Sequence, residues 1–516
     1  MFGVSPSFNA MNARLSGLKS HFTHWREWEL NPIVIKELRQ AVRSWAVTGM
    51  LLLFLTVLFI ASLTFLVTQS FNVDANMGLG GSMFSTFVAI LAGASIFFIP
   101  LYVGVRLAVE RQENNPDLLY VTTLSPARII RGKFYCGAYM TLLFFSAVMP
   151  FMAFANLLRG VDLPTEFFIL CFLFLVVCAT NMISIFLACI PASRPFKILL
   201  ALGGCFASFW IIVPLVELSY EMLRSGVGTM MAGRDFWIGT VTVLGIGVAI
   251  LGLFFVLAVA LISPASANRA LPVRIYITII WLLGLILSVG WVAQTGEGPL
   301  MFAWLYPTFA LMMLALLVTV SNSDQLSLRV RWRIPQSGFR RVLAFVFFNG
   351  AAGGLIWVGI ILALTGFATQ TVMTMFPSPA FSVPSGFGQW FITISAYAFA
   401  YALSALFIHR QFLPKRPPKF AGLIAILIPS LMALVPSVVM FFLNRLTWNS
   451  LEGLQLGNVF NLLALREDYQ RDFHLYFAVA WLAVMMALNA TWFFRQVNNF
   501  QLPIRVVPGS SPPILK

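Results

Sequence analysis

The chain contains few charged residues. Only 10% of its 516 residues are Asp, Glu, Lys or Arg, whereas 59% are hydrophobic. Soluble domains carry roughly 25% charged residues. The composition therefore excludes an ordinary soluble globular protein and predicts an integral membrane protein.

Cysteine and histidine are also scarce, with five and four copies respectively. The sequence has no C-x-x-C and no H-E-x-x-H. These absences disfavour a zinc site, a disulfide framework and a zinc protease. All five cysteines fall inside apolar runs, where we interpret them as small core residues: Cys136, Cys171, Cys178, Cys189 and Cys205.

No nucleotide-binding motif is present either. The sequence lacks G-x-x-x-x-G-K-[ST], so we expect this chain to hold no ATP in a P-loop. We predict no catalytic, metal-binding or cofactor-binding residue on it. The first forty residues contain no apolar stretch of the signal-peptide kind, and we expect no cleavable signal.

Long apolar runs dominate what remains. About twelve of them can each cross a roughly 30 Å hydrocarbon core as a helix, and none alternates as a barrel strand would. We predict an all-α polytopic membrane protein with about twelve transmembrane helices. The expected spans are 46–68, 84–106, 134–157, 167–190, 196–218, 236–262, 272–293, 299–320, 342–366, 389–408, 420–443 and 473–494.

The basic residues predict an orientation. With a cytoplasmic N-terminus, roughly four-fifths of the lysines and arginines fall in inner segments. We therefore expect both termini in the cytoplasm and the chain in the plasma membrane. Orientation and anionic lipid account for the excess of 33 Lys+Arg over 18 Asp+Glu without nucleic acid. We interpret the two acidic outer loops, 219–235 and 444–472, as solvated connections, with short interfacial helices as the alternative.

A basic amphipathic segment precedes the first span: N-P-I-V-I-K-E-L-R-Q-A-V-R-S-W. Asn31 fits an N-cap and Pro32 a first helical residue. The pattern predicts a helix lying in the membrane interface, and a plain positive-inside anchor is a compatible alternative. Its polar face carries Lys36, Arg39, Gln40 and Arg43, and Glu37 lies at the border with the apolar face.

The most polar internal stretch, 109–133, separates the second and third spans: V-E-R-Q-E-N-N-P-D-L-L-Y-V-T-T-L-S-P-A-R-I-I-R-G-K. Asn115 and Pro116 predict the start of a short helix, with Asp117 in its first turn, where a negative charge is favourable. Ser125 and Pro126 predict the start of a second helix. The alternative is a segment that merely joins two spans at the lipid headgroups.

Together these two segments resemble the membrane subunit of ABC-2-type transporters. In that family the first is the elbow helix, and the second is a coupling helix that docks into a separate ATPase. The resemblance implies a coupling helix at about 116–124 and an elbow comprising Asn31, Pro32, Lys36, Glu37, Arg39 and Arg43. It assigns coupling to the ATPase to Glu110, Arg111, Pro116, Asp117, Leu118, Leu119, Thr123, Leu124 and Ser125.

The match departs from the family pattern in two places, because Asn114-Asn115-Pro116 replaces the usual Gly-Thr and Arg128 stands near the customary acid. The family unit has about six spans. We therefore divide the chain into an arm with the elbow (1–45), a six-span domain (46–262), a second six-span region (263–494) and a cytoplasmic tail (495–516). The second region is an extension or a degenerate repeat.

Polar residues inside the expected spans are mostly amides, for which we expect hydrogen bonds to neighbouring helices: Asn181, Asn349 and Asn489. The pair Gly350 and Gly354 predicts close helix packing.

By resemblance, the expected function is the permease subunit of an ATP-driven exporter. ATP and Mg²⁺ would bind the partner ATPase, and this chain would be no enzyme. Expected partners are that ATPase, the bilayer, and a second copy or second permease chain. Two other classes stay open. One is a twelve-span secondary carrier, although loop 107–133 lacks G-x-x-x-D-R-x-G-R and carboxylates are nearly missing from the spans. The other is a non-transporting scaffold or assembly subunit.

Overall fold

The computed structural model describes the ranges 32–67, 78–113, 125–158, 161–191, 193–264, 266–322, 325–377, 386–442, 455–463 and 468–502. Over these ranges the chain is helical and contains no strand. Twelve of the described helices are long and apolar enough to cross a membrane. This confirms the prediction of an all-α polytopic membrane protein.

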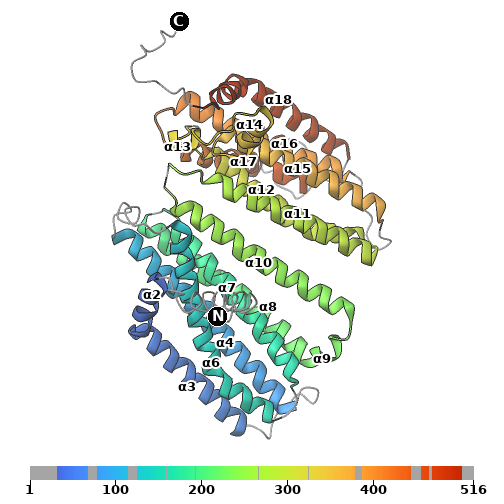
Figure 1. Ribbon diagram of the computed structural model, residues 1–516. Coiled ribbons are helices and arrows are strands. Elements are labelled where there is room, and N and C mark those ends of the chain that lie inside the picture. Colours follow the sequence, from blue (N-terminus) through green and yellow to red (C-terminus); the bar gives the residue numbers. More distant parts are fainter. Residues whose placement is uncertain are drawn as a thin grey trace, which may run out of the picture. The chain divides into compact units, whose positions relative to one another are not determined.

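The chain divides into two compact units, Met1–Ile262 and Ser263–Lys516. The division coincides with the end of the sixth predicted span. In Figure 1 the first unit runs from blue to green and the second from green to red.

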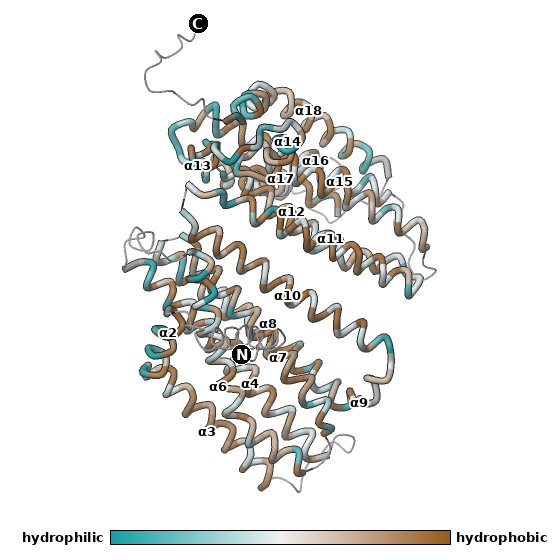
Figure 2. Tube along the Cα trace, viewed as in Figure 1, coloured by the Kyte–Doolittle hydropathy of each residue, from teal (hydrophilic) through white to brown (hydrophobic). Residues whose placement is uncertain are grey.

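In the first unit, α4 and α7 supply much of the buried core. Phe84, Phe87 and Ile99 of α4 pack with Phe144 of α6 and Ile185 of α7. In helices α3, α8 and α10, by contrast, few side chains are buried, as in lipid-facing helices. Figure 2 shows hydrophobic residues along most of α10 and hydrophilic ones at α2. The elements are α2 (Pro32–Val42), α3 (Trp45–Val67), α4 (Gly78–Glu113), α6 (Pro126–Leu157), α7 (Leu163–Cys189), α8 (Arg194–Ser225), α9 (Val227–Met230) and α10 (Arg234–Ile262).

Two glycines allow α7 to approach its neighbours closely. A Cβ added to Gly104 of α4 would lie 2.2 Å from Ser184 Oγ, and one added to Gly137 of α6 would lie 2.0 Å from Asn181 Nδ2. Ser184 Oγ also donates to the carbonyl of Pro100 at 2.5 Å. Polar groups on α7 therefore fill the space that side chains at these glycines would occupy, and they fix α7 against α4 and α6.

In the second unit, α15 and α16 are the most buried spans. Hydrogen bonds link α16 to α18, and α18 continues to Asn499, into the segment predicted as a tail. The elements are α11 (Ala270–Thr295), η1 (Gly298–Met301), α12 (Phe302–Val320), α13 (Leu328–Arg331), α14 (Gly338–Phe347), α15 (Ala351–Met375), α16 (Phe387–Phe412), α17 (Lys419–Phe442), η2 (Val459–Leu463) and α18 (Asp468–Asn499).

The predicted span 342–366 is wrong, because the chain breaks between α14 and α15. Only Ala351–Met375 forms the span, and α14 is a separate amphipathic helix. Gly350 has a φ of 138°, a conformation that side chains rarely adopt. The break places Asn349 between helices rather than inside a span, where its side chain accepts from the Ala270 amide at 2.7 Å.

The other two predicted amides contact neighbouring helices, as expected. Asn489 Nδ2 donates to the carbonyl of Leu403 at 3.2 Å. Asn181 Nδ2 lies 3.5 Å from the carbonyl of Phe134, which is a long hydrogen bond.

The segment 219–235, predicted as an outer loop, is solvated only in part, because it also contains helical turns that pack against the bundle. Helix α8 continues to Ser225, and the short α9 follows. Val227 is fully buried, and its amide donates to Thr165 Oγ1 of α7 at 2.9 Å. The polar start of α7 thus holds this segment against the helices.

The described part of the other segment predicted as an outer loop, 455–463, is largely buried against helices. Tyr401 of α16 donates to the carbonyl of Gly457 at 2.6 Å, and the Gly457 amide donates to the hydroxyl of Tyr397 at 3.2 Å. Gln455 and Asn458 are 2% and 5% exposed. The solvated interpretation is therefore wrong for these residues, because they pack against α16, whose tyrosines bond the main chain of Gly457.

Candidate functional site

A buried ion network joins three helices of the first unit. Lys133 of α6 donates to Glu37 Oε1 of α2 and to Glu110 Oε2 of α4, both at 2.6 Å. The side chains of Lys133 and Glu37 are each only 4% exposed, and that of Glu110 is 30% exposed. One ammonium group thus holds three helices together through two carboxylates.

Arg106 of α4 extends the network. Its Nε lies 3.5 Å from Glu37 Oε2, and its guanidinium donates to Tyr102 Oη at 2.8 Å and to Gln40 Oε1 of α2. Two cations therefore face two carboxylates, and the network as a whole is neutral. Balance of this kind is what allows charges to be buried, because an isolated buried charge is strongly unfavourable.

The pattern of α2 explains why Glu37 is inside. Val34, Glu37 and Ala41 follow one another at helical spacing, and each is at most 3% exposed. Glu37 therefore lies in the middle of the buried face and not at its border, which corrects the sequence interpretation. Lys36 and Arg39 are exposed on the opposite side.

Lys133 lies near the start of α6, and the helix is continuous from its first residue to Lys133. It begins at Pro126 after Ser125, which has the extended backbone of an N-cap residue but makes no side-chain capping bond. Lys133 follows two helical turns later. The predicted helix start at Ser125 and Pro126 is confirmed, and the helix continues as the third span to Leu157.

No protein-family model, no curated protein and no solved structure matches the chain. Its function is therefore inferred from its own residues.

In the sequence, the predicted coupling segment lies between two residues of the network, Glu110 and Lys133. Glu110 and Ser125 lie on either side, and Arg111 donates to the carbonyl of Cys189 at the end of α7. Pro32 begins α2, and Arg43 directly follows that helix and is exposed. Asn31 and six predicted coupling residues lie outside the described ranges: Pro116, Asp117, Leu118, Leu119, Thr123 and Leu124.

Sequence reasoning did not identify Lys133 and Arg106 as partners of Glu37. A signal was available, because charged residues next to long apolar runs must pair or reach the interface. What the sequence could not give was the pairing, since Glu37 and Lys133 are 96 residues apart.

The two glycines of the predicted packing pair have different surroundings. A Cβ added to Gly354 would lie 2.4 Å from Thr319 Cγ2 of α12 and 2.5 Å from Arg274 Nη2 of α11, whereas one added to Gly350 would meet no atom within 4 Å. Gly354 therefore permits a close approach, and Gly350 permits the backbone break. Gly353 is tighter still, because its added Cβ would lie 2.0 Å from the carbonyl oxygen of Phe345.

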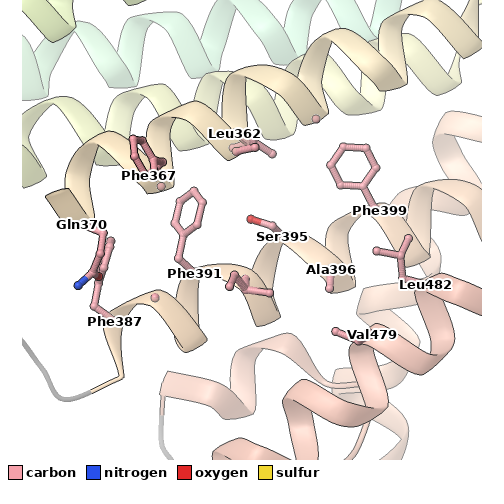
Figure 3. A pocket seen from close by; sticks show the side chains of 15 residues that line it. Leu362, Phe367, Gln370, Phe387, Phe391, Ser395, Ala396, Phe399, Val479 and Leu482 are labelled. Carbon is pink, nitrogen blue, oxygen red and sulfur yellow. The ribbon is translucent and has the colours of Figure 1, made fainter.

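A separate cavity of about 550 Å³ lies among α15, α16 and α18 of the second unit. Figure 3 shows aromatic rings around it, among them Phe367, Phe391 and Phe399. Gln370 Oε1 and Ser395 Oγ are buried and have no hydrogen-bond partner. Such a cavity suits a small uncharged molecule with a mostly apolar surface.

Nothing in the described ranges indicates a metal centre. No group of three or more His, Cys, Asp or Glu residues is arranged there to hold an ion.

Proposed function

We propose that this chain is the permease subunit of an ABC-2-type ATP-driven exporter, coupled to a separate ATPase through residues 116–124. The observation that supports the proposal most directly is the Glu37–Lys133–Glu110 network. It ties the proposed elbow helix to both helices that flank the proposed coupling segment. A force applied to that segment would therefore reach three helices together.

The proposed mechanism is a push by the ATPase. When the partner closes on ATP, it displaces residues 116–124, and the displacement enters α4 and α6. Lys133 lies nine residues after this segment and Glu110 six residues before it, so their ion pair prevents the two helices from separating. Because α4 is packed against α6, α7 and α8, its movement must be accompanied by movement of the neighbouring spans.

Exposed apolar residues of the first unit form a surface against which a second permease chain could pack. Helices α3 and α8 carry large exposed side chains such as Phe59, Phe206 and Trp210. Lipid or a second copy of the chain would cover them. In this proposal ATP and Mg²⁺ bind only the ATPase subunits.

Charging the apolar side of the coupling segment tests the proposal. We expect Leu118→Asp with Leu119→Asp to abolish co-purification with an ABC ATPase encoded in the neighbouring reading frame, because an apolar docking contact would gain two charges. The control is Leu118→Met with Leu119→Met, which keeps the side apolar and should leave binding intact. Unchanged co-purification and ATPase activity in the Asp variant would refute the coupling role, and the absence of a neighbouring ATPase would favour the carrier or scaffold.

Labelling from outside tests the orientation. We expect an impermeant maleimide added to intact cells to modify Ser225→Cys and to leave Lys36→Cys unmodified until the cells are opened. Both positions are exposed. Lys36 is on α2 and Ser225 ends α8 just before α9, and Figure 1 shows α2 and α9 at opposite ends of the first unit. Wild-type protein gives the background from the native cysteines. Labelling of Lys36→Cys in intact cells would place the network on the outer side, where no ATPase could reach it.

A further inference from the structure

An elongated cavity of about 600 Å³ lies between α4, α7 and α8 of the first unit. It extends along α8 from Lys197 to Ile211 and along α4 from Val109 back to Phe97. At 1.5 Å per residue these stretches are roughly 20 Å long. That length is somewhat more than half of a hydrocarbon core about 30 Å thick.

The interior of this slot is apolar. Its serine and threonine side chains are bonded to main-chain carbonyls: Thr180 to Val177, Ser184 to Pro100 and Ser208 to Gly204. Their hydroxyl groups therefore already donate hydrogen bonds within the protein. Large apolar residues of α8 beside the slot, such as Leu202 and Phe206, are exposed, so it lies next to the hydrocarbon region.

One end of the slot is positively charged. Lys197 is the only charged residue among the described residues that line it. Arg111 lies two residues after Val109, and it donates to the carbonyl of Cys189, the residue after Ala188; Val109 and Ala188 both line the slot. Among the carboxylates whose side chains the structure describes, none forms an ion pair with Lys197. Arg111 is held in place by its bond to the carbonyl of Cys189. An apolar slot about as long as one leaflet thus ends at Lys197, with Arg111 at the same end.

From this geometry we infer that the slot binds one acyl chain of an anionic phospholipid, whose phosphate contacts Lys197 and Arg111. The lipid belongs to the leaflet at the basic edge of the first unit. This inference does not depend on the proposed permease function. A lipid held in this way would pack between α4 and α8, and it would also contact α7.

Native mass spectrometry of the detergent-purified full chain tests the inference, with phosphatidylglycerol and phosphatidylcholine as probes at equal concentration. We expect wild-type protein to retain phosphatidylglycerol preferentially. Lys197→Gln should reduce that preference about five-fold, the effect of one basic residue near a membrane surface. Arg131→Gln is the matched control, because Arg131 is an exposed cation of the same edge that does not line the slot, and the preference should persist there.

Filling the slot gives a second and independent test. A Cβ added to Gly204 would come no closer than 4.0 Å to Leu187 Cδ1, so Gly204→Leu places its side chain in the slot without a backbone clash. We expect this variant to lose phosphatidylglycerol, and the control Gly245→Leu on α10 to retain it. Equal retention of the two lipids by wild-type protein, an unchanged preference in Lys197→Gln, unchanged retention in Gly204→Leu, or displacement of the lipid by glycerol phosphate alone would each overturn the inference.

Discussion

Replacing Lys133 by methionine is expected to destabilise the first unit by about 3–5 kcal/mol, the cost of leaving a buried charge without its partner. The methionine side chain would fill much of the same space, but Glu37 would keep only the longer contact with Arg106. The measurement is the thermal unfolding midpoint of the purified chain in detergent. A midpoint equal to that of wild type would show that the network contributes no stability.

A second substitution separates charge from packing. In Lys133→Met with Glu110→Gln, the remaining charges are Glu37 and Arg106, which compensate each other. We expect this double variant to recover most of the lost stability, because the uncompensated carboxylate has been removed. If the double variant is as unstable as Lys133→Met alone, the loss comes from packing. ATPase co-purification by the rescued variant would then test the proposed coupling separately from folding.

Replacing Arg274 by methionine is expected to loosen α14 in the second unit. The guanidinium donates to the carbonyls of Val346, Phe348 and Gly350 at 2.7, 2.6 and 3.1 Å. Arg274 is 3% exposed, and a cation near a helix C-terminus is favourable. Each carbonyl left without a donor should cost about 1–3 kcal/mol. We expect a total of roughly 3 kcal/mol, at the low end for three carbonyls, because the substitution also removes the unfavourable burial of a charge.

Limited trypsin digestion measures this effect locally. We expect faster cleavage after Arg340 and Arg341 of α14 in Arg274→Met than in wild type, together with a lower unfolding midpoint. Arg274→Lys should give an intermediate result, because a lysine cannot span three carbonyls as a guanidinium does. Arg329→Met, at an exposed arginine of α13, is the matched control. Identical digestion of the Arg274 and Arg329 variants would contradict the proposed role of Arg274 in holding α14.

The sequence was most informative where a single local property decides the structure. Eleven of the twelve predicted spans overlap described helices closely, since the length of an apolar run determines whether a helix can cross the bilayer. Ser125 and Pro126 marked the start of α6 correctly. The failure at 342–366 has a local cause, because the apolar pattern of α14 runs on into α15 and conceals the break at Gly350.

Arg274 shows the limit of charge patterning. By position it counts as one more basic residue at the inner edge, and the rule for orientation treats it like an exposed arginine. In the structure it is buried against the main chain between α14 and α15. Its role depends on carbonyls more than seventy residues away in the chain.

Composition and run length by themselves determined that this protein is a helical membrane protein with about twelve spans, because hydrocarbon accepts only segments whose backbone bonds are satisfied internally. Only the tertiary structure decided which charges meet. Glu37, Glu110 and Lys133 lie on three helices, and the chain separates Glu37 from Lys133 by 96 residues. The physical reason is that insertion depends on each segment alone, whereas an ion pair depends on how separate helices pack.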